Sequence, residues 1–166
     1  MNNKTRIYLD ACIFVAYFHE KHPNHKEVKD CLKNLKSFVN LEICASYWSV
    51  NEMIKVLRKE YHFSEEKVNK IAKSIFETSS IGKISILWVD VDSAKEYTFR
   101  EFFDHVTSNL IESKKDTHLA DAIHSVIMIN NKLENILTTN GDDFKGIGSF
   151  IAIEPKVVNA LPLKEI

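Results

Sequence analysis

Short apolar runs recur along the chain, separated by longer stretches in which apolar residues return every three or four positions. The short runs are rich in β-branched and aromatic residues, which predicts β-strands. Turn residues bound them, since Asn140 and Gly141 follow one run and Pro155 follows the last. The predicted strands span residues 6–9, 41–45, 84–89, 136–139 and 150–153.

The longer stretches predict helices, most of them amphipathic. Asn24, Ser46 and Ser64 stand where helix N-caps are expected. Strands that alternate with helices predict an α/β fold, a three-layer arrangement with a mainly parallel central sheet of about five short strands and helices on both faces. We expect one domain over residues 1–155 and a C-terminal tail over residues 156–166. The predicted helices span residues 11–19, 24–38, 46–61, 64–82, 93–111 and 116–132.

Composition limits the possible partners. The 166 residues include 22 Lys and Arg against 23 Asp and Glu, and the resulting net charge of −1 gives no global attraction to nucleic acid. An RNA partner would need a local basic patch, although a solvated helix face explains the same lysines equally well. No stretch reaches the ~18 apolar residues of a membrane span and no signal peptide is evident, so we expect no membrane association and a cytoplasmic protein. The basic residues considered are Lys55, Arg58, Lys59, Lys114 and Lys115.

The chain has an odd number of cysteines, and they show neither zinc-type nor redox-type spacing. They are Cys12, Cys31 and Cys44. They are expected to be small buried side chains. Two histidine patterns are also poor metal sites. The pattern at residues 19–25 contains Pro23, and the outer histidines of residues 118–124 lie about 120° apart on a helix.

Acidic residues stand where a parallel sheet builds its sites. Functional groups gather at the carboxyl ends of parallel strands. Asp10 ends the first predicted strand, and Asp142 and Asp143 follow the fourth. Glu52 and Asp121 lie on predicted helices, away from their apolar faces. In the last helix, that face is expected to consist of Leu119, Ala122, Ile123, Val126 and Ile129.

Each of these residues also has an ordinary structural explanation. Asp10 could cap the helix that follows it, and Glu52 could form a solvated pair with Lys55. Asp121, taken alone, is best explained as a surface residue. Asp116 begins a predicted helix, and an N-cap role explains it better than a place in the wall of a site.

Three motifs follow one another along almost the whole chain. The first is an apolar strand that ends in Asp10 and runs into an apolar helix, and the second is a helix with an isolated Glu52. The third is Asp121-Ala122-Ile123-His124, which precedes the Thr-rich strand end and the acidic turn at residues 138–143. In their order and spacing these motifs resemble the PIN domain, the ribonuclease fold of the VapC-like toxins.

The resemblance implies a metal-dependent endoribonuclease that hydrolyses RNA phosphodiester bonds. Carboxylates that meet repel one another unless a cation lies between them, and Mg²⁺ or Mn²⁺ prefers such oxygen ligands. Glu52 would be a ligand or a base that holds water. The implied catalytic and metal-binding residues are Asp10, Glu52, Asp121 and Asp142. The implied supporting residues are Thr139, Asn140, Asp143 and Asp116.

The turn after the fourth predicted strand departs from the family pattern. The resemblance leads one to expect an acid at Asn140 or Gly141, and none stands before Asp142. Because glycine tolerates a positive φ, the turn could swing Asp142 back toward Asp10. We therefore expect Asp142 to complete the cluster, ahead of Asp143.

The resemblance further implies the toxin of a type II toxin–antitoxin pair, which could act as a homodimer. A small antitoxin would place its C-terminal segment beside the carboxylates. Two alternatives stay open, a degenerate PIN module that binds RNA or protein without cleavage and an RNA-processing nuclease without an antitoxin. A phosphotransferase with Asp10 as nucleophile is disfavoured, because Cys12 stands where a second Asp would be expected.

Overall fold

The centre of the molecule is a six-stranded sheet in the order β3-β4-β2-β1-β5-β6. The computed structural model describes residues 4–90, 104, 107–108, 119–144 and 149–160. Each neighbouring pair of strands in the sheet is parallel except β3 and β4, so the predicted mainly parallel α/β fold is confirmed. The strands are β1 (Thr5–Leu9), β2 (Leu41–Ala45), β3 (Ser80–Ile81), β4 (Ile84–Trp88), β5 (Asn135–Leu137) and β6 (Ile151–Ile153).

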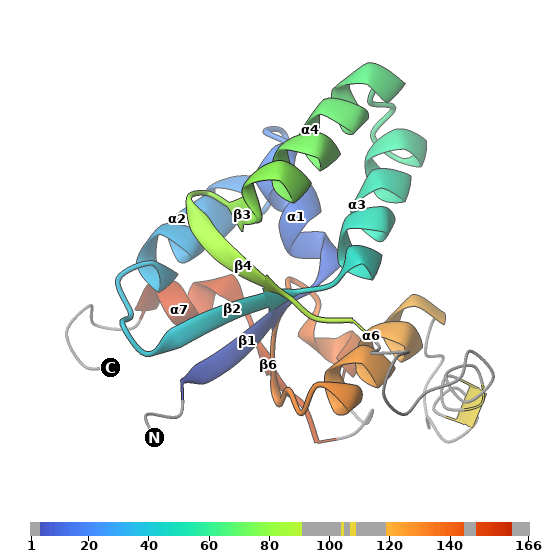
Figure 1. Ribbon diagram of the computed structural model, residues 1–166. Helices are drawn as coiled ribbons and strands as arrows, with labels where there is room; N and C mark the ends of the chain where they lie inside the picture. The colour runs from blue at the N-terminus through green and yellow to red at the C-terminus, as the bar shows by residue number, and fades with distance from the viewer. Residues whose placement is uncertain (1–3, 91–103, 105–106, 109–118, 145–148, 161–166) are drawn as a thin grey trace.

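Helices cover both faces of this sheet, with α1 to α4 on one side and α6 on the other (Figure 1). Ser46 and Ser64 accept hydrogen bonds from the backbone N–H groups of Ser49 and Lys67, which confirms two predicted N-caps. Among the described helices, none has the length and apolar character needed to cross a membrane. Of the predicted helix over residues 93–111, the structure describes only residues 104, 107 and 108, which are helical. The helices are α1 (Ala11–Phe18), α2 (His25–Leu35), α3 (Tyr47–Lys59), α4 (Glu65–Thr78), α6 (Leu119–Asn130), α7 (Pro155–Ala160) and the 3₁₀ helix η1 (Gly141–Phe144).

Alternating side chains of β1 and β2 build two hydrophobic cores. Ile7 and Leu9 face the core beneath α1 to α4, whereas Tyr8 faces the core beneath α6. In β2, Ile43 likewise faces the core beneath α1 to α4 and Cys44 faces the core beneath α6. Successive side chains of a strand point to opposite faces, and a parallel sheet buries both. This alternation places the Tyr8 side chain next to α6.

The two-residue strand β3 was not predicted. It pairs with β4 across Gly82 and Lys83, whose φ angles are 58° and 64°. Two successive left-handed residues are typical of the type I′ turn that joins hairpin strands. A strand of this length is too short to show alternation. Helix α4 consequently ends earlier than expected, before the left-handed Ser79.

The predicted apolar face of α6 is partly wrong. Leu119 and Ile129 were expected in the core but are 55% and 48% exposed. His124, Ser125 and Met128 are buried instead. Both polar side chains have hydrogen-bond partners, which makes their burial tolerable. A pattern of apolar residues cannot indicate polar residues that are buried in this way.

Residues 156–160 were expected in a tail but form most of α7, which packs against α2. Asn159 Nδ2 donates to the backbone oxygen of Glu27 at 3.0 Å, and the side chain of Val158 is buried. Proline is favoured at the first position of a helix, so Pro155 both follows a strand and begins a helix. This part of the predicted tail therefore belongs to the folded domain.

The packing of α7 predicts different effects for two neighbouring valines. Val158 is 3% exposed and Val157 is 50% exposed. Val158→Ala should lower the free energy of unfolding by about 1.6 kcal/mol or more, because it removes two buried carbons at ~0.8 kcal/mol each. Val157→Ala should change it by less than about 0.5 kcal/mol. Urea unfolding measures both values, and equal effects would contradict the packing of α7.

Candidate functional site

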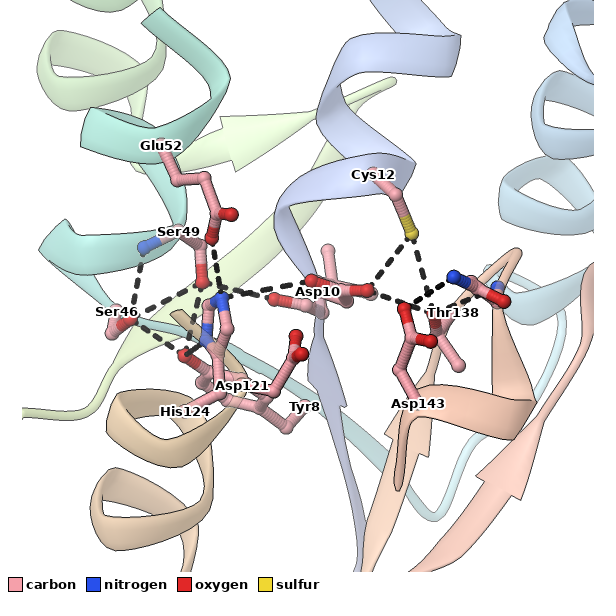
Figure 2. Close-up of polar contacts among 12 residues, drawn as sticks. Tyr8, Asp10, Cys12, Ser46, Ser49, Glu52, Asp121, His124, Thr138 and Asp143 are labelled. Carbon is pink, nitrogen blue, oxygen red and sulfur yellow. Dashed lines mark hydrogen bonds and ion pairs between the residues drawn. The ribbon is translucent and has the colours of Figure 1, made fainter. Parts of the chain in front are cut away.

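Asp10 lies at the carboxyl end of the central strand β1, immediately before α1. Its backbone N–H donates to the oxygen of Leu137 at 3.1 Å, which holds the residue beside β5. Asp10 occupies the N-cap position of α1, yet its side chain makes no capping hydrogen bond. The carboxylate instead points toward the groups of the site (Figure 2).

One oxygen of Asp10 is held by hydroxyl and thiol donors. Oδ2 accepts from Thr138 Oγ1 at 2.7 Å and from Cys12 Sγ at 2.9 Å. Burial, with the charge of Asp10, raises the pKa of the Cys12 thiol well above its ordinary value, so the thiol keeps its proton at neutral pH. The backbone N–H groups of Thr139 and Asn140 donate to Cys12 Sγ and Thr138 Oγ1. The direction of the carboxylate is thereby fixed.

The other oxygen of Asp10 faces a buried histidine. His124 Nε2 lies 3.6 Å from Asp10 Oδ1 and 2.9 Å from Glu52 Oε2. The ring's second nitrogen, Nδ1, lies 2.7 Å from the Tyr8 hydroxyl (Figure 2). The imidazole of His124, on α6, is therefore surrounded by Tyr8 of β1, Glu52 of α3 and Asp10, which follows β1.

The Tyr8 hydroxyl is the centre of a buried polar network. It lies 2.6 Å from Ser46 Oγ and 3.0 Å from Ser49 Oγ, at the start of α3. Burial raises the pKa of Tyr8, so its phenol keeps its proton and can donate as well as accept. One consistent direction of donation runs from Ser46 to Tyr8, from Tyr8 to His124 Nδ1, and from His124 Nε2 to Glu52.

A cavity of about 200 Å³ opens beside these groups, and four carboxylates line it. They belong to Asp10, Glu52, Asp121 and Asp143. Burial, followed by the charges of Asp143 and Asp10, raises the pKa of Asp121 to about 6. Negative charge therefore accumulates in the cavity. A hard divalent cation would relieve this repulsion, so the residues present fit Mg²⁺ or Mn²⁺.

The donor atoms that lie closest together are only partly those expected. Among the described residues, one group of three has its donor atoms all within 4.8 Å of one another, and it consists of Asp10, Glu52 and His124. Asp121 lines the same cavity, and Figure 2 shows its carboxylate near that of Asp10. The structure therefore brings the three predicted acids together and adds a histidine to them.

Asp142 and Asp143 lie differently with respect to the cavity. Asp142 is exposed and does not line the cavity, whereas Asp143 is half-buried and does. The positive φ expected at Gly141 is not observed. The turn forms η1 instead, in which residues three apart share a side. Asp143 accordingly lies beside Asn140, whose side-chain amide donates to its carboxylate.

The remaining predicted residues contribute less to this geometry. Asn140 lines the cavity, and Thr139 contributes its backbone N–H. Lys55, Arg58 and Lys59 are exposed on α3, and Arg58 pairs with Glu65 at 3.8 Å. Three predicted residues, Lys114, Lys115 and Asp116, lie outside the described residues.

Four further residues of the site were given no role from the sequence, namely Tyr8, Cys12, Thr138 and His124, although His124 and Thr138 belong to the third motif. One signal was present, because His124 follows Asp121 by three positions and therefore shares its helix face. Cys31 and Cys44 are fully buried as expected. Cys12 is only partly buried and its thiol donates a hydrogen bond to Asp10, so its interpretation as a small buried apolar side chain is wrong.

The three histidines of residues 19–25 lie in different surroundings. The ring of His19 packs against that of Tyr61, with the centroids 4.1 Å apart. His25 Nδ1 lies 2.8 Å from the oxygen of Ala16. His22 points differently and lines the carboxylate cavity.

Comparison with known proteins identifies the fold family. The family model of the PIN domain matches residues 7–149. The chain belongs to the PIN domain family. Asp10, Glu52, Asp121 and Asp143 all lie within the matched range of this PIN domain. Among curated proteins, none matches the sequence.

Solved structures similar to this PIN domain include three with low sequence identity. Mycobacterium tuberculosis VapC20, a sarcin-ricin loop cleaving toxin, is 12% identical with a TM-score of 0.59, covering 86% of this chain and 97% of VapC20. VapBC2 from Rickettsia felis, bound to a promoter DNA fragment, is 17% identical with a TM-score of 0.61, covering 90% and 98%. VapBC-1 from nontypeable Haemophilus influenzae is 14% identical with a TM-score of 0.59, covering 92% and 99%. These likenesses show a shared fold.

The raised pKa of Asp121 predicts how stability depends on pH in ion-free protein. The pKa of about 6 lies above the ordinary 3.8, so the folded chain holds this proton more tightly than the unfolded chain. The resulting stabilisation is fully present below about pH 4 and is lost as the pH rises through about 6. Asp121→Asn should remove this loss and unfold at a higher urea concentration than wild type at about pH 7.5.

Urea midpoints measured in chelator from about pH 4 to 8 test this prediction. A variant that follows the wild-type pH dependence would contradict the raised pKa. So would a variant that is less stable than wild type at the upper end of the range.

Proposed function

We propose that this PIN domain is a metal-dependent endoribonuclease that acts as the toxin of a type II toxin–antitoxin pair. The observation that carries the proposal is the convergence of four carboxylates, from four separate segments, on one cavity. Membership of the PIN family supports nuclease activity. The similarity to VapC20, a sarcin-ricin loop cleaving toxin, supports RNA as the substrate.

The carboxylates have separate roles in this proposal. Asp10 is the central ligand, since its direction is fixed by Thr138 and Cys12. Glu52 is a ligand or a base that takes the proton of the attacking water, and without the ion its carboxylate lies 2.9 Å from His124 Nε2. Bound Mg²⁺ or Mn²⁺ would act as a Lewis acid that activates water and offsets charge on the phosphate. Asp121 and Asp143 supply further negative charge on the cavity wall.

Asp143 can replace the acid that the family pattern leads one to expect at Gly141. The non-cleaving alternative was motivated by the acid missing from that position. Asp143 lies on the cavity wall and can fill its role. Nuclease activity is therefore the better proposal, and the fourth carboxylate is assigned to Asp143 instead of Asp142.

Basic residues beside Glu52 are suited to RNA phosphates. Lys55 and Lys59 follow Glu52 by three and seven positions, so all three share one stripe of α3. Both lysines are exposed. An RNA strand held along this stripe would pass the opening of the cavity.

An antitoxin would inhibit the enzyme by placing a segment beside the same carboxylates. The cavity reaches the surface and its charge favours a basic partner. Two of the similar structures are VapBC assemblies, which supports a protein partner for this chain. The same comparison is compatible with a homodimer.

Cleavage assays on two neighbouring variants test the site. Asp143→Asn should lower the rate of Mn²⁺- or Mg²⁺-dependent RNA cleavage at least tenfold, about 1.4 kcal/mol, because it removes a carboxylate from the cavity wall. Asp142→Asn, which changes an exposed neighbour, should retain most activity. A chelator should abolish cleavage by wild type.

The opposite ranking would transfer the role to Asp142. Cleavage that persists in excess chelator would contradict metal dependence. A folded wild-type protein that cleaves no RNA with either ion would contradict the proposed activity itself.

A further inference from the structure

His124 presents both ring nitrogens to groups of the site although its side chain is fully buried. A buried polar group is costly unless it has partners. The partner of Nδ1 is the Tyr8 hydroxyl, and both groups that face Nε2 are carboxylates, those of Glu52 and Asp10. Nε2 therefore points toward the position where an ion would bind.

The distances around Nε2 match those between ligands on a single ion. Two ligand atoms bound at about 2.1 Å lie roughly 3.0 Å apart at a right angle and about 3.6 Å apart at wider angles. Nε2 lies 2.9 Å from Glu52 Oε2 and 3.6 Å from Asp10 Oδ1. The three donor atoms all lie within 4.8 Å of one another. An ion can therefore replace the bond between His124 and Glu52 with little side-chain movement.

Coordination needs the lone pair of Nε2, so the ring proton must then reside on Nδ1. The Tyr8 hydroxyl accepts from Nδ1–H in that tautomer and donates its own proton to Ser49 Oγ, 3.0 Å away. Ser49 can accept because its hydroxyl donates to the oxygen of Leu9. Ligating histidines almost always have such a partner on the second nitrogen. Tyr8 is suited to the role of a positioning residue.

We propose that His124 Nε2 binds the ion together with Asp10 and Glu52, and that Tyr8 orients the ring for this. The inference rests on the proposed function, because it concerns the same ion site. An imidazole ligand favours first-row transition ions, whereas Mg²⁺ prefers oxygen ligands and gives up its waters reluctantly. The site therefore selects Mn²⁺ over Mg²⁺.

Pulsed electron paramagnetic resonance on Mn²⁺ tests the coordination directly. With ¹⁵N-labelled histidine, the full-length wild-type protein should show a ¹⁵N coupling typical of a directly bound imidazole. His22→Gln is the matched control, because His22 lines the same cavity from another segment, and this variant should keep the coupling. His124→Gln should lose it. If His124→Gln fails to fold, the wild-type and His22→Gln spectra still test whether a histidine other than His22 binds the ion.

Ion affinities measured by titration calorimetry test the role of Tyr8. His124→Gln and Tyr8→Phe should each weaken Mn²⁺ binding at least tenfold while weakening Mg²⁺ binding much less. The ratio of the two affinities is the relevant readout. A Tyr8→Phe variant that loses both affinities equally would show that the hydroxyl supports the structure only, and would overturn its positioning role.

The outcomes distinguish this inference from the proposed function. Mn²⁺ bound to wild type without a ¹⁵N coupling, or with a coupling lost in His22→Gln instead, would overturn ligation by His124 and leave a carboxylate site intact. Wild-type protein that binds neither ion would overturn both proposals.

Discussion

The buried Tyr8 hydroxyl is the interaction on which the geometry of the site depends. Strand alternation turns Tyr8 toward α6, where it contacts Ser46, Ser49 and His124. These contacts join β1 to the start of α3 and to the middle of α6. Each of these polar groups would cost ~1–3 kcal/mol if it were buried without a partner. The network therefore favours one relative placement of the three elements, and Asp10, Glu52 and Asp121 are placed with them.

This placement concentrates negative charge, which opposes folding in the absence of an ion. The raised pKa of Asp121 is one consequence of that charge and of burial. Donors from Thr138, Cys12 and His124 offset part of the repulsion at Asp10 and Glu52. The clustered acids thus favour cation binding and lower the stability of the ion-free protein. Such clusters of like charge are common at functional sites.

Local signals in the sequence predicted most of the fold. Short apolar runs located the five longer strands, and the serine caps located the starts of α3 and α4. The strand β3 was missed because its two residues form a hairpin through backbone conformation at Gly82 and Lys83. Helix α7 was missed because Pro155 ends strands as readily as it begins helices.

The site was predictable only in part, for a related reason. Asp10, Glu52 and Asp121 could be found because their motifs fix both residue type and position. The assignment of Asp143 over Asp142 depends on the 3₁₀ turn, which the sequence does not distinguish from a swing at Gly141. His124 and Tyr8 are polar residues buried by long-range contact, and one residue's environment cannot be read from its own sequence neighbourhood.

The central claim is that the carboxylate cluster around Asp10 binds a divalent ion in the folded state. Thermal unfolding with and without Mn²⁺, in wild type and Asp10→Asn, tests it most directly. Binding to the native state alone should stabilise wild type by about 2.7 kcal/mol when the ion is at about 100 times its dissociation constant. The melting temperature of wild type should therefore rise, and that of Asp10→Asn should rise far less. Equal shifts in the two proteins, or no shift in wild type, would contradict the claim.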